Sequence, residues 1–301
     1  MINESILKEY EASYKLGSTL RRNVVKYIER CRLEDGGYFF ACVLPSSGLD
    51  TYFAVKSLSI LRMKPDKPEE IANFFLNHMS DGWLDDIVGL FVASEVLNEL
   101  GLITVDYRHF AGQRIESLQN QTGGFGGYEN IDVEVPSELQ ATYRAMKVIS
   151  ILGLDFNGGE NVTRFVSSLL NDDGGYGRNN FSTLASTFYA TEIHKLLGTN
   201  MKKFASTRDY LRDSEAKWRA NFDNNHVSFL EELFWLIGGL ANLGEKTNFP
   251  DRVTRFVMAC QRVNGGFSRA SIMGIPTLEY TFCALSILSE VGVLWDVSGF
   301  Q

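Results

Sequence analysis

The feature that most constrains the fold of this chain is a repeated glycine pair. Four segments of the chain contain Gly-Gly followed by an aromatic residue, and in each an apolar run follows that begins near a threonine and a second aromatic residue. The second glycines of these pairs are Gly37, Gly124, Gly175 and Gly266. Two of the gaps, 87 and 91 residues, are nearly twice the usual spacing of about 45. Degenerate copies fill both gaps, "MSDGWLDDIVGLFVASEVLNELG" from Met79 and "RANFDNNHVSFLEELFWLIGGLANLG" from Arg219, so six repeats tile the chain.

Each repeat predicts two helices joined by the glycine turn. In "DRVTRFVMACQ" the apolar residues Val253, Phe256, Val257 and Cys260 recur at helical spacing, which is typical of a helix with one buried face. The stretch after the turn, such as "TFCALSIL", is apolar almost all round and predicts a helix enclosed by neighbours. The glycines supply backbone conformations that are barred to other residues, and the aromatic residue can seal the helix ends.

Six such hairpins can form an open solenoid or a closed ring. An open inner face would expose a large apolar patch, so the apolar second helices favour closure. We therefore expect an all-α fold, an (α/α)6 toroid of six helical hairpin repeats that forms a single domain over residues 1–301.

Composition excludes several classes of partner. The net charge of −8 and the pI near 5.2 argue against a nucleic-acid or anionic-membrane surface, which requires neutralising cations. No run of about 18 apolar residues predicts a transmembrane segment, and the N-terminus is polar. Cys31, Cys42, Cys260 and Cys283 show no C-x-x-C spacing and are interpreted as reduced thiols of a cytoplasmic protein.

Two motifs carry a resemblance to a known family. "QRVNGGF" and "QNQTGGFGG", with the helix starts that follow them, resemble the repeats shared by protein prenyltransferase β subunits and by squalene-hopene and other class II terpene cyclases. The resemblance covers residues from about 20 to 292, and the last repeat is most similar to the end of a Rab geranylgeranyltransferase β subunit. It implies a toroid whose aromatic-lined cavity holds an isoprenoid chain, with a possible helical partner subunit.

The zinc site of the prenyltransferases is the first test of function. The resemblance places its aspartate, cysteine and histidine positions at Ser228, Leu230 and Tyr280, of which Leu230 offers no donor atom. The diphosphate-binding positions of the family fall on Thr183, Phe222 and Asn225, which form no positive cluster. We therefore expect no metal and no cofactor.

The cyclase motif D-x-D-D is the second test. Its closest counterpart, "SGLDTYFAV", keeps only the last acid, Asp50, for which an N-cap role is the preferred interpretation. The acid pair at Asp85 and Asp86 also lies at an inner-helix start, where capping is commoner than catalysis.

The remaining candidates lie near the inner-helix starts, where the cavity of a toroid would open. A carboxylate in an apolar cavity can protonate an alkene or stabilise a carbocation, and aromatic faces can add cation-π stabilisation. The candidate catalytic residues are Asp50, Asp86, Glu138, Glu231, Glu279 and Tyr280. The candidate substrate-binding residues are Tyr52, Tyr143, Phe188, Trp235 and Phe282. For each of them, capping and core filling remain the alternative.

Three functions stay open at this point. The first is a zinc-independent protein of the prenyltransferase or terpene cyclase type that binds or acts on an apolar, isoprenoid-like substrate. The second is a non-catalytic toroid that binds a ligand or serves as a scaffold subunit, and the third is a degenerate prenyltransferase β subunit. An acidic rim of Glu138, Glu231 and Glu279 predicts that a neutral or cationic apolar ligand binds better than a prenyl diphosphate.

Overall fold

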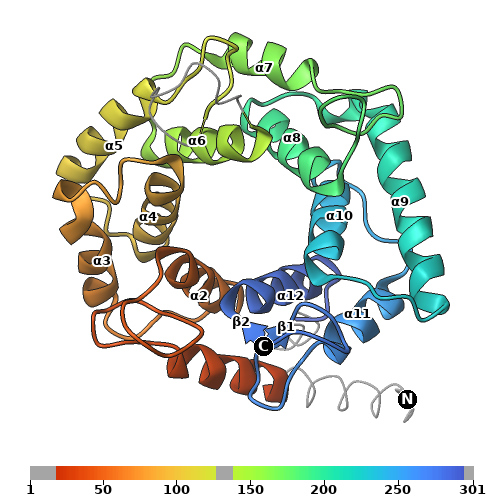
Figure 1. Cartoon of the computed structure of the whole chain (residues 1–301), viewed down its shortest axis with the longest axis horizontal. Coiled ribbons are helices and arrows are strands. Elements are labelled where there is room, and N and C mark those ends of the chain that lie inside the picture. The colour runs from red at the N-terminus through yellow and green to blue at the C-terminus, as the bar shows by residue number, and fades with distance from the viewer. Residues whose placement is uncertain (1–17, 127–137, 295–301) are drawn as a thin grey trace, which may run out of the picture.

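The computed structural model describes residues 18–126 and 138–294, and these form two concentric layers of helices (Figure 1). The inner layer consists of α2 (Gly48–Ile60), α4 (Ile87–Leu100), α6 (Leu139–Leu152), α8 (Leu184–Leu196), α10 (Leu230–Asn242) and α12 (Leu278–Glu290). The outer layer consists of residues 18–30, α3 (Pro68–Leu76), α5 (Val105–Ser117), α7 (Gly159–Ser167), α9 (Ala205–Asp223) and α11 (Pro250–Ala259). The predicted all-α toroid is confirmed.

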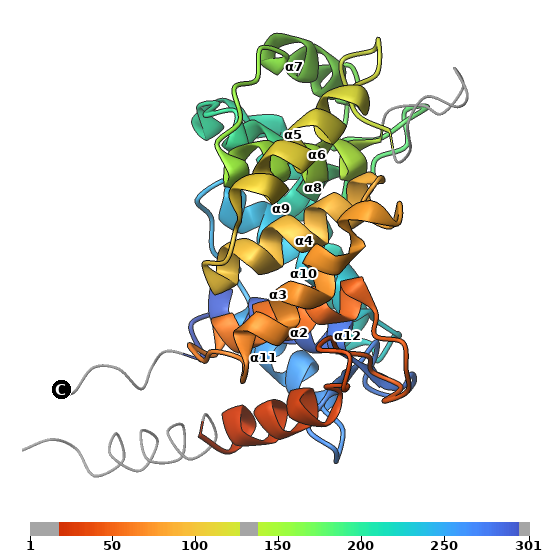
Figure 2. The ribbon, with the colours of Figure 1, turned by 90° about the vertical axis from the view of Figure 1, so that its left-hand side faces the viewer.

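The inner layer is a closed ring. Each inner helix packs against the inner helix of the repeat before it and of the repeat after it, and α12 packs against α2. The described strands, β1 (Phe267–Ser268) and β2 (Pro276–Thr277), form one short antiparallel pair just before α12. The helices of the two concentric layers have roughly parallel axes, as the side view shows (Figure 2). Closure, rather than an open solenoid, is thus confirmed.

A buried threonine attaches each glycine turn to its inner helix. The N–H of the aromatic residue after the glycines donates to this hydroxyl in four repeats, for instance from Tyr38 to Thr51 at 2.9 Å and from Tyr176 to Thr187 at 3.0 Å. The hydroxyl of Thr187 in turn donates to the carbonyl of Thr183, one turn earlier, at 2.8 Å. Because all of these groups are buried, each bond satisfies a donor that would otherwise be costly to enclose.

The first glycine of each pair packs against the next repeat. Gly265 has φ +97°, and a Cβ built on it would lie 2.2 Å from the backbone oxygen of Asn23 in the first outer helix. Gly174 is similar, with φ +85° and the oxygen of Ser206 at 2.2 Å. Only glycine combines this backbone conformation with such close approach. Gly265 therefore helps to join the last repeat to the first.

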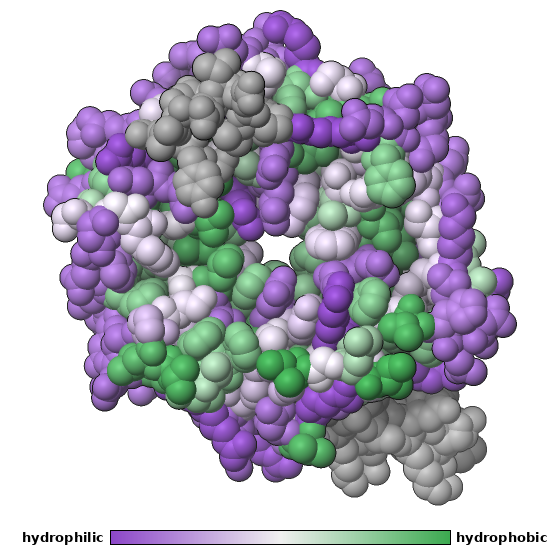
Figure 3. All heavy atoms as spheres, in the orientation of Figure 1, coloured by the Kyte–Doolittle hydropathy of each residue, from purple (hydrophilic) through white to green (hydrophobic). Residues whose placement is uncertain are grey.

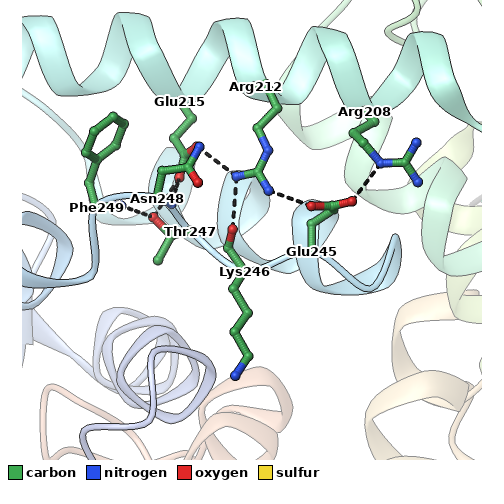
Figure 4. A network of polar contacts seen from close by, with 8 residues as sticks. All are labelled: Arg208, Arg212, Glu215, Glu245, Lys246, Thr247, Asn248 and Phe249. Carbon is green, nitrogen blue, oxygen red and sulfur yellow. Dashed lines mark hydrogen bonds and ion pairs between the residues drawn. The ribbon is translucent and has the colours of Figure 1, made fainter.

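In the fifth repeat, the outer layer is held by a polar network instead (Figure 4). The Glu215 carboxylate, 2% exposed on α9, accepts from the hydroxyl of Thr247 at 2.6 Å and from the backbone N–H of Asn248 at 2.9 Å. Arg212 donates to Glu215 at 2.9 Å and to Glu245 at 2.7 Å. This network anchors the loop after α10 to the outer helix.

The described ranges contain no helix that is both long enough and apolar enough to cross a membrane. The four cysteines are free thiols, and only Cys42 is exposed.

Candidate functional site

An aromatic girdle lines the ring of inner helices. One aromatic side chain, five residues after the N-cap of its helix, comes from each of the six inner helices. Each ring contacts the next, with centroids 5.2 to 6.4 Å apart, and the last contacts the first at 5.9 Å. The girdle consists of Tyr52, Phe91, Tyr143, Phe188, Phe234 and Phe282. In the space-filling view, an opening lies at the centre of the molecule (Figure 3).

Sequence reasoning placed four of the six girdle residues among the substrate-binding candidates. It missed Phe91, and it named Trp235 where the girdle member of α10 is Phe234. Both errors fall in the degenerate repeats, which have no threonine to mark the helix start. Counting five residues from the N-caps Asp86 and Phe229 gives the right residues, so helix-start signals could have found them.

Trp235 nevertheless lies close to the girdle. Desolvation raises the pKa of the neighbouring Tyr189, and hydrogen bonds from Gln140 and Trp235 oppose that rise. The amide of Gln140 donates to the Tyr189 hydroxyl at 2.8 Å. The polar tips of these side chains are therefore satisfied beside the aromatic faces.

One turn further along the inner helices lies a charged ring. Lys56, Glu95, Lys147 and Glu192 stand nine residues after the N-caps of α2, α4, α6 and α8, so that their charges alternate. Glu95 is 3% exposed and pairs with Lys56 at 3.1 Å and with Lys147 at 3.3 Å. Desolvation opposes the charge of Lys56, but Glu95 and Glu99 outweigh it and raise the pKa of the lysine. The channel is thus apolar at the girdle and charged beyond it, a change that the apolar composition of the inner helices did not predict.

Arg144 is a cation that the sequence analysis did not single out. It lies on α6 next to the girdle, with its guanidinium carbon 5.9 Å from the centroid of the Phe91 ring. Its positive charge opposes the rise that desolvation causes in the pKa of Tyr52 and of Tyr189. The wall of the channel therefore carries one positive charge at the level of the aromatic rings.

Asp50 lies at the end of the ring where the inner helices begin, which we call the mouth. It is 8% exposed, and burial together with the nearby Glu279 carboxylate raises its pKa from 3.8 to about 6, against the hydrogen bond from the Phe40 backbone. The N-cap of α2 is Ser47, whose hydroxyl accepts from the N–H of Asp50. The N-cap interpretation of Asp50 was therefore wrong, because the preceding serine already fills that position.

Glu231 and Glu279 complete an acidic rim with Asp50. Desolvation and the charge of Glu231 raise the pKa of Glu279, and Arg269 opposes this. Arg269 donates to one oxygen of Glu231 at 2.5 Å and stacks over the Phe229 ring at 4.1 Å. The second oxygen, Oε2, is buried without a hydrogen-bond partner in the structure. In this rim, besides burial, the charge of Glu231 raises the pKa of Glu279, and the charge of Glu279 raises the pKa of Asp50.

Tyr280 borders this rim, whereas two other candidate acids lie apart from it. Desolvation and the charges of Glu231 and Glu279 raise the pKa of Tyr280. Asp86 caps α4 by accepting from the N–H of Gly89 at 2.7 Å. Glu138 is exposed at the start of α6, beside a cavity of about 390 Å³ that Arg178 also lines. The structure therefore brings together Asp50, Glu231, Glu279 and Tyr280, but not Asp86 or Glu138.

The zinc positions inferred from the family require a correction in the fifth repeat. The marker threonine stands four residues after the N-cap in the well-formed repeats, and the N-cap Phe229 puts that position at Leu233. In the fifth repeat, the family positions were thus assigned one residue too early in the sequence. The aspartate and cysteine positions become Phe229 and Glu231, and the basic pair becomes Asp223 and His226.

The corrected positions still do not fit a zinc site of that kind. Phe229 has no donor atom, one oxygen of Glu231 is held by Arg269, and desolvation disfavours a Tyr280 phenolate. In the described part of the chain, no three His, Cys, Asp or Glu side chains are grouped so that they could hold a metal ion.

The family model for the prenyltransferase alpha-alpha toroid domain matches residues 4–91, 86–216 and 203–299. The chain belongs to this family. A comparison with curated protein sequences finds no match. The resemblance inferred from the glycine repeats is therefore confirmed at the level of the family.

Solved structures of a protein geranylgeranyltransferase and of a terpene cyclase have a similar fold. Protein geranylgeranyltransferase-I of Candida albicans, complexed with GGPP, superposes with a TM-score of 0.70 at 18% identity, over 89% of this chain and 90% of that one. The type II terpene cyclase MstE from Scytonema, in complex with geranylgeranyl dihydroxybenzoate, has a TM-score of 0.52 at 10% identity, over 94% of this chain and 99% of that one. At these identities the likeness shows the toroid fold alone.

Proposed function

We propose that this toroid binds an isoprenoid-like apolar chain inside its ring of inner helices, without zinc. The observation that carries the proposal is the closed aromatic girdle, in which every inner helix contributes one ring to a continuous apolar collar. Aromatic faces suit the flat, unsaturated units of an isoprenoid, and a preformed collar orders little on binding. The two similar structures, one with GGPP and one with a geranylgeranyl benzoate, support this substrate class.

The acidic rim supports a neutral or cationic head group over a diphosphate. A diphosphate at the mouth would meet Asp50, Glu231 and Glu279, with Arg269 already paired to Glu231. The positive charge of Arg144 lies beside the Phe91 ring, at the level of the girdle, where the chain rather than the head group would lie. Repulsion at the rim therefore penalises the head group, while burial of the chain is the same for both ligands.

The rim also supports proton donation as the reaction, if the ligand is transformed. A pKa of about 6 leaves a fraction of Asp50 protonated near neutral pH, which is the state that can transfer a proton to an alkene carbon. The cation formed on the ligand would then face the aromatic rings, which stabilise positive charge. Glu279, whose negative charge helps to raise the pKa of Asp50, would act as a positioning residue for this step.

Analysis of bound lipid tests the binding proposal. The purified protein is extracted with organic solvent, and the extract is identified by mass spectrometry. We expect an isoprenoid-like compound in the wild type, less of it in Phe234→Ala, and an unchanged amount in Phe110→Ala, which removes a ring from the outer helix α5. An extract free of such compounds, or equal recovery from Phe234→Ala, would contradict the proposal.

A partner subunit is a second proposal, supported by exposed apolar side chains around the mouth. Ile272, Met273 and Ile275, in the loop between β1 and β2, are 78%, 51% and 63% exposed, and Val43 before α2 is 57% exposed. Exposed apolar residues gathered in one loop, such as Ile272, Met273 and Ile275, are typical of protein interfaces. The test is affinity capture with the wild type and with Ile272→Ser/Met273→Ser. A helical protein held by the wild type alone supports a partner, and equal capture by both contradicts it.

A further inference from the structure

The charged ring is incomplete on one side of the channel. Lys56, Glu95, Lys147 and Glu192 alternate in charge around α2, α4, α6 and α8, but the equivalent positions of α10 and α12 are Gly238 and Ser286. The next member in the alternating order would be a cation on α10. Glycine at this position of α10 has no side chain to supply it.

A cavity of about 310 Å³ lies at this gap. Gly238 and Ser286 line it together with Glu192, and Phe188 and Phe234 of the girdle form another part of its wall. The centroids of the two phenylalanine rings are 5.3 Å apart and their planes are tilted by 57°, so two neighbouring aromatic side chains contribute to this wall. A Cβ on Gly238 would lie 2.7 Å from Phe188 Cε2, so the glycine leaves room for that ring. The size is at the lower end of the range for small-molecule sites.

The charges of this cavity favour a cation. Glu192 and Glu290 both line it, and neither carboxylate has a hydrogen bond or ion pair among residues 18–126 and 138–294. Lys195 also lines it, but its ammonium group donates to Asn242 Oδ1 at 3.3 Å. The formal charges of Glu192, Glu290 and Lys195 therefore sum to one negative charge, beside two aromatic side chains.

We propose that this cavity, which we call the lower pocket, binds an organic ammonium ion with its charge beside Glu192. The carboxylate supplies the counter-charge, and the faces of Phe188 and Phe234 supply cation-π attraction. A cation beside Glu192 would continue the alternation of charge that Lys56, Glu95 and Lys147 maintain on the other side of the ring. The inference goes beyond the proposed function, since it concerns another level of the channel and requires no isoprenoid chain.

Calorimetry with two isosteric probes tests the assignment. Choline and 3,3-dimethylbutan-1-ol have the same shape, and only choline carries a positive charge. We expect choline to bind about tenfold or more tightly than the alcohol, and Glu192→Gln to weaken choline by a similar factor while leaving the alcohol unchanged. Glu99→Gln is the matched control, because Glu99 bonds Ser59 and Lys56 outside the lower pocket.

Three results would overturn the proposal: no binding of choline, equal affinity for both probes, or equal losses in Glu192→Gln and Glu99→Gln. Circular dichroism checks that each variant is folded. If Glu192→Gln does not fold, Ser286→Leu, which fills the lower pocket from α12, takes its place and must abolish choline binding. Farnesol is titrated in parallel. Loss of choline binding with farnesol binding intact refutes this inference alone, and the reverse result refutes the proposed function alone.

Discussion

Substituting Gly265 tests how the ring closes. In Gly265→Ala the new methyl group would lie 2.2 Å from the Asn23 carbonyl oxygen, about 1 Å inside normal contact, and φ of +97° is unfavourable for any side chain. Conformational strain of about 1–2 kcal/mol and overpacking of about 1–3 kcal/mol add to an expected loss of about 2–5 kcal/mol in the free energy of unfolding.

Gly82→Ala is the matched control for this prediction. Gly82 occupies the turn of the degenerate second repeat with φ +84°, but its nearest neighbour is only the Asp85 side chain at 3.5 Å. The control should lose about 1–2 kcal/mol, from strain alone. Urea unfolding followed by circular dichroism measures both variants. Equal losses would mean that the contact between the last and first repeats does not restrain the ring, and would refute the reasoning.

Three further substitutions test single contacts. Thr187→Val leaves the buried N–H of Tyr176 without its acceptor and should lower the free energy of unfolding in urea by about 1–3 kcal/mol. Thr187→Ser keeps the hydroxyl and is the control. Equal losses in the two variants would contradict the role of the threonine as acceptor. Glu215→Ala removes the acceptor of four hydrogen bonds in the outer layer and should lower the free energy of unfolding by about 3 kcal/mol or more. Glu160→Ala, at an exposed position, is the control, and a smaller loss in Glu215→Ala than in this control would contradict the prediction. The pKa of Asp50 is raised in the folded state to about 6, so the folded protein binds a proton more tightly than the unfolded chain, and its stability falls as the pH rises from about 4 to 6. Asp50→Asn should therefore be more stable than the wild type at pH 7, by up to about 3 kcal/mol, and should lose that advantage by pH 4. A pH-independent difference would show that Asp50 does not titrate in this range.

The architecture was predictable because its determinants are local and repeated. Gly36, Gly123, Gly174 and Gly265 all have positive φ and all pack against the backbone of the next outer helix, so one contact recurs with one sequence signature. The threonine hydroxyl that accepts from the turn recurs in the same way. A period in the sequence therefore becomes a period in space, and six repeats that each bury an inner helix close into a ring.

The candidate site was less predictable because it depends on which side chains meet across repeats. Phe91 and Phe234 were missed where the repeats are degenerate and the threonine is absent. Asp50, Glu231 and Glu279 are far apart in sequence. Their helices meet because α12 packs against both α10 and α2, and its contact with α2 exists only through ring closure. The alternating charges of Lys56, Glu95 and Lys147 likewise come from different helices, so no local pattern indicates their pairing.

Calorimetric comparison of farnesol with farnesyl diphosphate, without added metal, tests the central claim most directly. The two ligands bury the same chain in the girdle, and only the head group meets the acidic rim of Asp50, Glu231 and Glu279. We predict tighter binding of farnesol, with the difference reduced in Glu231→Gln/Glu279→Gln. A clear preference of the wild type for the diphosphate would contradict the account of the rim and would favour a prenyltransferase β subunit instead.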